Sequence, residues 1–328
     1  MKTPTIVNYG IFDNTDDRAG TELFSKTERL PYVRIEGCGD FSVHKTFDCG
    51  QAFRFDPTEL SPELLAASGD PNGSMKEIYG GSALGKKVVF SGDGCGALTI
   101  YNSTPEEFHE LWCGYLGLDE DYDAINRSIV GSEAFCSEDG RRTMIEAAAA
   151  GRGIRILRQD PFECLISFII SQNNNIPRIK KIIGALCDTY GEDGRFPTAS
   201  SLVSAGVDGL FALRTGFRAA YIYDAAYRVM HGDIDIAKIA ESADFDYCTA
   251  ELCRIKGVGP KVSACALLFG FHKLEAFPVD VWMKKSIAAH FPDGLDYKKL
   301  GPYAGVAQQY LFYYERYLGG AIEQNAKA

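Results

Sequence analysis

The chain has 328 residues, of which 46% are hydrophobic and 24% are charged, so it can bury one large core or two ordinary ones, and a disordered chain is excluded. Its net charge of −10 argues weakly against a nucleic-acid-binding protein, although a summed charge conceals local positive patches. No run approaches about 18 apolar residues and the N-terminus lacks an apolar signal segment, which argues against a membrane-spanning or secreted protein.

The first 125 residues are expected to form an antiparallel β domain. Residues 32–55 alternate between apolar and polar side chains with glycine breaks, and residues 77–102 have the pattern of strands joined by turns. A short helix is expected over Thr104–Tyr115, because Thr104 is a suitable N-cap and Glu107 completes a capping box.

From residue 126 onwards the pattern becomes helical. Apolar residues recur at helical spacing in segments that end on Gly, Asn or Pro, namely 143–153, 160–175, 176–191, 199–213, 219–233, 246–255, 260–272, 280–291 and 305–318. We therefore predict an α+β fold class, in which an N-terminal antiparallel β domain of residues 1–125 precedes a mostly α-helical domain of residues 126–328.

The ten cysteines do not form a recognisable metal site. None belongs to a C-x-x-C pair, no histidine cluster completes a zinc site, and the spacing excludes a terminal four-cysteine iron–sulfur loop. We expect free thiols in a reducing compartment, with no metal bound.

A helix, a tight turn and a second helix are predicted around residues 251–272. Gly257-Val258-Gly259 forms the turn, and Pro260 suits the first turn of the next helix. The free backbone N–H groups at such a helix start bind phosphate without side-chain charge. The same pattern also fits a helical corner that serves only for packing.

Lys261 and Asp280 both lie at predicted helix starts. At a helix start the dipole opposes a positive charge, and the neutral amine is the nucleophilic form of a lysine such as Lys261. Asp280 is placed to cap the helix that begins at Val281. The alternatives are that Lys261 is an ordinary exposed lysine and that Asp280 is only a structural cap. One helix and a short loop separate them, so both can face one cleft.

Several segments, in order, resemble the 8-oxoguanine DNA glycosylase family (its eukaryotic-type branch) of the helix-hairpin-helix superfamily. The matching segments are CGQAFRF at Cys49–Phe55, LRQDPFECLISFIISQNNNIPRI at Leu157–Ile179, TGFRA at Thr215–Ala219, GVGPK at Gly257–Lys261, FPVD at Phe277–Asp280 and GPYAGVAQQYLF at Gly301–Phe312. The resemblance implies that the helical domain is a helix-hairpin-helix glycosylase domain.

The resemblance implies a bifunctional DNA glycosylase and abasic-site lyase that removes 8-oxoguanine, opposite cytosine, during base excision repair. Lys261 would attack C1′ of the damaged nucleoside, form a Schiff base and allow β-elimination. Asp280 would stabilise the positive charge that develops on the sugar.

The resemblance also assigns residues to the damaged base, which must leave the duplex to be excised. The Gly50 carbonyl would accept a hydrogen bond from N7–H of 8-oxoguanine, which guanine lacks. Cys265 and Phe312 would sandwich the purine, and Gln308 would bind its Watson–Crick edge. Cys265 lies one helical turn after Lys261, and Gln308 one turn before Phe312.

A further set of residues would bind the opened duplex. Asn173 would fill the gap with support from Asn174 and Asn175, Phe217 would wedge into the opposite strand, and Arg178 and Arg218 would bind the unpaired cytosine. The hairpin residues Gly257, Val258 and Gly259 would bind backbone phosphate. Trp282 stands where relatives carry a phosphate-binding histidine.

Two alternatives to this function remain open: a related glycosylase for another damaged base, and a non-catalytic DNA-binding module. The expected partner is double-stranded DNA containing 8-oxoguanine, bound by a monomer without a required cofactor, iron–sulfur cluster or membrane. The expected location is intracellular, in the cytoplasm or nucleoid of a bacterium or the nucleus of a eukaryote.

Overall fold

A computed structural model describes residues 3–14, 18–24 and 29–317, and the chain divides into two units. The first unit contains residues 1–123 together with 152–157, and the second contains residues 124–151 and 158–328. The return of residues 152–157 to the first unit has no signal in the sequence pattern.

The first unit is built on a six-stranded antiparallel sheet with the strand order β1-β2-β6-β5-β4-β3. The expected α+β fold class, with an N-terminal antiparallel sheet followed by a mostly helical region, is confirmed. The strands are β1 (Thr5–Asp13), β2 (Arg29–Glu36), β3 (Phe55–Pro57), β4 (Glu77–Ala83), β5 (Lys86–Gly92) and β6 (Leu98–Tyr101).

Aromatic side chains fill the core on one face of this sheet. Phe47 lies 4.3 Å from Phe55 and 5.3 Å from Phe90, measured between ring centroids, and all three are buried. Such pairs add stabilisation beyond the apolar area they bury. The predicted capping box of Thr104 and Glu107 is present at the start of α3 (Pro105–Glu107), which continues through η3 (Phe108–Trp112) and α4 (Cys113–Tyr115).

The alternation in residues 32–55 indicated a β-rich segment broken by glycine, but Val43–Asp48 of this segment forms a helix, α1. Ser42 caps this helix by accepting a hydrogen bond from the Lys45 backbone N–H. The Glu77 carboxylate, on β4, accepts hydrogen bonds from the Ser42 hydroxyl and the His44 backbone N–H. A distant acid thus satisfies donors at the helix start, which local alternation cannot reveal.

Gln51 holds the turn after α1 against the returning segment. Its amide nitrogen donates to the carbonyl oxygens of Thr46 and Arg155 at 2.9 and 2.8 Å, and its amide oxygen accepts from the Leu157 N–H at 2.9 Å. Gln51 is buried, so these bonds are shielded from water. They fix the position of the neighbouring Gly50, which has a φ of 80°.

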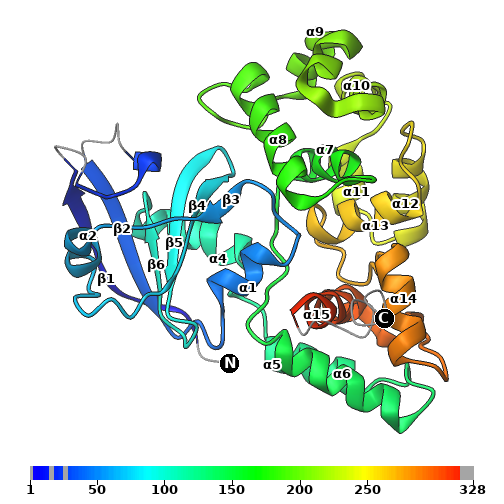
Figure 1. The fold of residues 1–328 in the computed structure, drawn as a ribbon, viewed down its shortest axis with the longest axis horizontal. Coiled ribbons are helices and arrows are strands. Elements are labelled where there is room, and N and C mark those ends of the chain that lie inside the picture. Colours follow the sequence, from blue (N-terminus) through cyan, green and yellow to red (C-terminus); the bar gives the residue numbers. More distant parts are fainter. Residues whose placement is uncertain (1–2, 15–17, 25–28, 318–328) are drawn as a thin grey trace, which may run out of the picture. The chain divides into compact units, whose positions relative to one another are not determined.

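The second unit is helical, and α7 and α13 lie side by side within it (Figure 1). Phe168 of α7 stacks on Phe269 of α13 with ring centroids 5.3 Å apart. The helices are α5 (Tyr122–Gly131), α6 (Glu138–Ala150), α7 (Pro161–Ser171), α8 (Ile176–Tyr190), α9 (Ala199–Leu210), η4 (Phe211–Thr215), η5 (Gly216–Arg218), α10 (Ala219–Met230), α11 (Ile236–Glu241), α12 (Phe245–Cys253), α13 (Pro260–Phe269), α14 (Val281–His290), η6 (Tyr297–Tyr303) and α15 (Ala304–Tyr317); α2 (Pro62–Ala67) and η2 (Glu22–Phe24) belong to the first unit.

The last helix packs closely on the centre of the second unit. A methyl group at Gly305 of α15 would lie 2.3 Å from a methyl carbon of Leu268 on α13, so glycine permits this approach. A methyl group at Gly151, after α6, would lie 2.4 Å from Cδ1 of Tyr310. In the part of the chain that is described, no helix is long and apolar enough to cross a membrane.

Candidate active site

The hairpin between α12 and α13 has the predicted form. Val258 donates a backbone hydrogen bond to the Ile255 carbonyl at 3.0 Å, and Gly257 adopts a φ of 79°. Pro260 occupies the first turn of α13, whose N-cap residue is Gly259. Glycine brings no side chain to cap the helix, which leaves backbone N–H groups available for an anion.

Gly257 packs directly on an aromatic ring of α10. A methyl group at this position would lie 2.2 Å from Cδ2 of Tyr221, and the positive φ also disfavours any side chain. The Tyr221 ring makes an edge contact with Phe217, with centroids 5.7 Å apart. One ring therefore contacts both the hairpin and the turn that carries Phe217.

We expect Gly257→Ala to lower the free energy of unfolding by about 2 to 3 kcal/mol, because the change combines left-handed strain with overpacking. Denaturant titration measures this loss. Gly259→Ala is the matched control, because its φ is −108° and, apart from its chain neighbours, no atom of the described residues lies within 4 Å of the added methyl group. Its cost should stay below about 1 kcal/mol. Equal stability of the two variants would contradict the close packing.

Lys261 is half-buried in the first turn of α13, and its ammonium nitrogen Nζ lies 5.6 Å from the centroid of the Phe168 ring. Phe168 is itself buried and stacked on Phe269, so the ring is a fixed platform. A cation over an aromatic face is attracted by the ring quadrupole. This contact holds the Lys261 amine against the buried Phe168 ring.

Cys265 connects Lys261 to Asp280 electrostatically. Burial raises the pKa of the Cys265 thiol, the positive charge of Lys261 and a side-chain hydrogen bond with it lower that pKa, and the negative charge of Asp280 raises it. The amine and the carboxylate therefore both act on one buried thiol. The charges of Lys261 and Asp280 both reach Cys265, and a cleft shared by Lys261 and Asp280 stays a prediction.

Asp280 is the N-cap of α14, as predicted from the sequence. Its Oδ1 accepts a hydrogen bond from the Met283 N–H at 2.7 Å. The preceding loop is held by Phe277, which is buried and stacks on Tyr297 with centroids 4.8 Å apart. Trp282, in the first turn of the same helix, is 51% exposed.

Gln308 of α15 carries a buried polar atom that lacks a partner. The side chain is 7% exposed, and within the described residues its amide oxygen Oε1 accepts no hydrogen bond. A buried acceptor left unpaired is destabilising by about 1–3 kcal/mol, so it suits a ligand that donates a hydrogen bond. Phe312 lies one helical turn later and is half-buried.

The asparagines after α7 form an exposed loop. Asn173 has a φ of 48° and is exposed, whereas Asn174 donates from its amide to the Ile170 carbonyl at 3.2 Å. Asn175 is the N-cap of α8 and accepts from the Arg178 N–H at 3.0 Å. The run therefore ends one helix and begins the next, with Asn173 presented between them.

Arg218 ties this loop to the turn that carries Phe217. Its guanidinium donates to the carbonyl oxygens of Gln172, Asn173 and Thr215, with 2.9 Å to Asn173 and 3.2 Å to Thr215. Burial, and then the positive charge of Arg178, lower the pKa of Arg218. Phe217, stacked against this guanidinium at 4.4 Å, is 54% exposed.

Two family models together match most of the chain. The model described as 8-oxoguanine DNA glycosylase, N-terminal domain, matches residues 37–165, and the model described as HhH-GPD superfamily base excision DNA repair protein matches residues 166–298. Among solved structures, MBOgg1 in complex with a low-affinity DNA ligand is 32% identical, with a TM-score of 0.75, over 95% of this chain and 100% of that one.

The chain belongs to the 8-oxoguanine DNA glycosylase family.

Other members of the family give the same result. The Clostridium acetobutylicum 8-oxoguanine glycosylase/lyase, solved with DNA containing cytosine opposite 8-oxoguanine, is 34% identical, with a TM-score of 0.73, over 88% of this chain and 96% of that one. The Arabidopsis thaliana N-glycosylase/DNA lyase OGG1 is 34% identical over 189 residues, which are 54% of this chain and 52% of the relative. The chain thus spans about half the length of this curated relative.

Two aromatic residues that sequence reasoning missed support the candidate site residues. Phe168 supports Lys261, and Tyr221 joins the hairpin to Phe217. Phe168 looked like one more apolar residue of a buried helix, and the Tyr221 contacts join segments far apart in the chain. Gly50 belongs to the first unit, whereas the other candidate site residues belong to the second.

Proposed function

We propose that the protein excises 8-oxoguanine from duplex DNA, opposite cytosine, and then cleaves the strand at the abasic site. The observation that carries the proposal is the grouping of Lys261, Cys265 and Asp280, which unites a nucleophile, a wall for the base and a carboxylate. The relatives named above, a glycosylase/lyase and an N-glycosylase/DNA lyase, support this activity.

The chemistry begins at the Lys261 amine. Its nitrogen lone pair forms a bond to C1′, and the C1′–N9 bond breaks with its electron pair leaving on the base, which takes up a proton. Opening of the deoxyribose ring then gives a protonated imine between C1′ and the lysine nitrogen. Loss of a proton from C2′ then expels the 3′ phosphate by β-elimination. The Asp280 carboxylate stabilises the positive charge on the sugar as the base departs.

The flipped base is held by one backbone carbonyl and three side chains. The Gly50 carbonyl accepts from N7–H of 8-oxoguanine, which distinguishes it from guanine. Cys265 and Phe312 contact the two faces of the purine. The unpaired Gln308 amide oxygen accepts from the N–H donors of the Watson–Crick edge, so binding removes the cost of the buried, unsatisfied acceptor.

The opened duplex is held by the loops at the end of α7 and before α10. Asn173 fills the space left by the flipped base, and Asn174 and Asn175 hold its loop in shape. Phe217 enters the opposite strand, which its exposure and its support by Tyr221 favour.

The unpaired cytosine is bound by Arg178 and Arg218. Arg178 is exposed, and its guanidinium has donors besides the Nη2 that bonds the Arg214 carbonyl, so it can reach the base while it keeps that bond. Arg218 must exchange hydrogen bonds with Gln172 and Asn173 to reach it, which would link cytosine binding to the Asn173 loop.

The hairpin residues Gly257, Val258 and Gly259 and the Trp282 indole N–H bind backbone phosphate. Residues 1–125 then act as the N-terminal β domain and 126–328 as the catalytic domain of a monomer that acts inside the cell, in the cytoplasm or nucleoid if bacterial and in the nucleus if eukaryotic. The reaction as proposed requires no cofactor and no iron–sulfur cluster, because the amine supplies the nucleophile and the carboxylate the counter-charge.

Borohydride trapping tests the proposal, because borohydride reduces the imine to a stable covalent adduct. End-labelled duplexes would carry 8-oxoguanine opposite each of the four bases, with guanine opposite cytosine as the control. We expect the strongest adduct for 8-oxoguanine opposite cytosine and none for guanine. An adduct only with another damaged base would favour a related glycosylase. Duplex binding without base release or an adduct would favour a non-catalytic module.

A further inference from the structure

Arg214 has a backbone conformation that arginine rarely adopts. Its φ is 62° and its ψ is 26°, within the π-helical turn η4. This left-handed region brings the side chain of an L-residue close to its own backbone, and glycine is the residue that usually occupies it. Strain of this kind persists where surrounding structure fixes it, and it is concentrated at functional sites.

The contacts on both sides of Arg214 fix this conformation. The buried Thr215 hydroxyl donates to the Leu210 carbonyl at 2.9 Å, which closes the turn. Arg178 donates from Nη2 to the Arg214 carbonyl oxygen at 3.4 Å. Arg218 donates from Nη1 to the Thr215 carbonyl oxygen at 3.2 Å. Arg178 and Arg218 therefore both hold the backbone around Arg214 in place.

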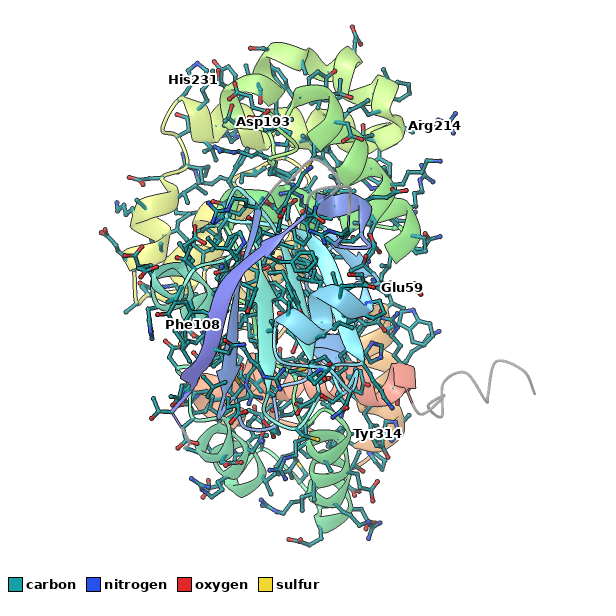
Figure 2. The ribbon with its side chains drawn as sticks, turned by 90° about the vertical axis from the view of Figure 1, so that its left-hand side faces the viewer. Glu59, Phe108, Asp193, Arg214, His231 and Tyr314 are labelled. Atoms are coloured by element: carbon teal, nitrogen blue, oxygen red, sulfur yellow. The ribbon has the colours of Figure 1, made fainter. Side chains whose placement is uncertain are left out.

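The Arg214 side chain is exposed and projects away from the neighbouring helices of the second unit (Figure 2). Among the described residues no carboxylate pairs with it. It stands three residues before the exposed Phe217, and Arg178 and Arg218 gather at the same loops. In a chain with a net charge of −10, this is a local concentration of positive charge beside the residue proposed to enter DNA.

We propose that Arg214 binds a backbone phosphate of the strand that Phe217 enters, and that its strained conformation aims the guanidinium at that phosphate. The proposal rests on the proposed function, since it specifies how the same loops hold the duplex. A guanidinium matches the geometry of phosphate oxygens and binds them with two charge-assisted hydrogen bonds. The contact stabilises the distorted strand without reading its sequence.

The test uses the full chain and a duplex with an uncleavable abasic analogue opposite cytosine. Affinity is measured by fluorescence anisotropy across a salt titration. Arg214→Gly should weaken binding roughly three- to tenfold and reduce the slope of log affinity against log salt by about 1. The same variant should raise the melting temperature, because glycine relieves the left-handed strain. Arg214→Lys should keep most of the salt slope.

Two variants control for effects other than the phosphate contact. Arg214→Asn removes the charge while tolerating the left-handed conformation, so it should bind as weakly as Arg214→Gly. Arg127→Ala removes an exposed charge from α5, at the other end of the helical unit, and should bind like the wild type (Figure 1). Unchanged affinity and salt slope in Arg214→Gly would overturn the proposal. Failure of the wild type to bind the duplex would instead overturn the proposed function.

Discussion

Lys261→Gln is expected to abolish borohydride trapping and to reduce release of 8-oxoguanine by at least about 10³-fold. Glutamine is polar and only slightly shorter than lysine, but it cannot attack C1′ or form an imine. The free energy of unfolding should change by less than about 1 kcal/mol, because loss of the contact with Phe168 is offset by removal of a positive charge at a helix start. Single-turnover assays on labelled duplex measure the rate.

Because Lys261→Gln is expected to remain folded, a loss of activity can be assigned to the missing amine. Lys261→Gln should still bind a duplex with an uncleavable abasic analogue, which shows that the DNA-binding loops are intact. Lys76→Gln removes the same charge from an exposed position in the first unit and should react like the wild type. A covalent adduct that survives Lys261→Gln would mean that another amine is the nucleophile.

Local signals in the sequence account for the parts of the fold that were predicted well. The caps at Thr104 and Asp280 are formed by residues three apart, so the pattern that predicts them also contains their partners. The start of α1 depends on Glu77, more than thirty residues away, and alternation around Ser42 therefore gave the wrong element. The return of residues 152–157 is likewise fixed by the distant side chain of Gln51.

In the candidate site too, contacts within one helix could be predicted from the sequence, whereas contacts between distant segments could not. Helical spacing predicted that Lys261 and Cys265 face one direction, and the electrostatic influence of one on the other agrees with this. The platform under Lys261 comes from α7, and no spacing rule joins Phe168 to it. Arg214 was missed for another reason, because a sequence does not state which arginine adopts a left-handed backbone. The residue types thus predicted which chemistry the site could perform. The packing of the fold determines which of these side chains are held in place.

Asp280 has a structural role and a proposed chemical one, and a single substitution separates them. Asp280→Asn keeps an oxygen that can accept the Met283 N–H, so the cap of α14 should survive, and the free energy of unfolding should fall by no more than about 1 kcal/mol. The carboxylate charge is lost, and with it the stabilisation of the cationic sugar. The rate of base release should therefore drop about 10²- to 10³-fold.

A second aspartate N-cap in the same unit serves as a control for the effect of losing the Asp280 charge. Asp235 caps α11 and accepts from the Lys238 N–H at 3.0 Å, so Asp235→Asn makes the same chemical change at a cap that is not one of the candidate site residues. It should leave the rate unaltered. Asp280→Ala removes both functions and should add about 1 kcal/mol of destabilisation to a similar loss of rate. Near-normal base release by Asp280→Asn would reduce Asp280 to a helix cap and require another source of negative charge beside Lys261.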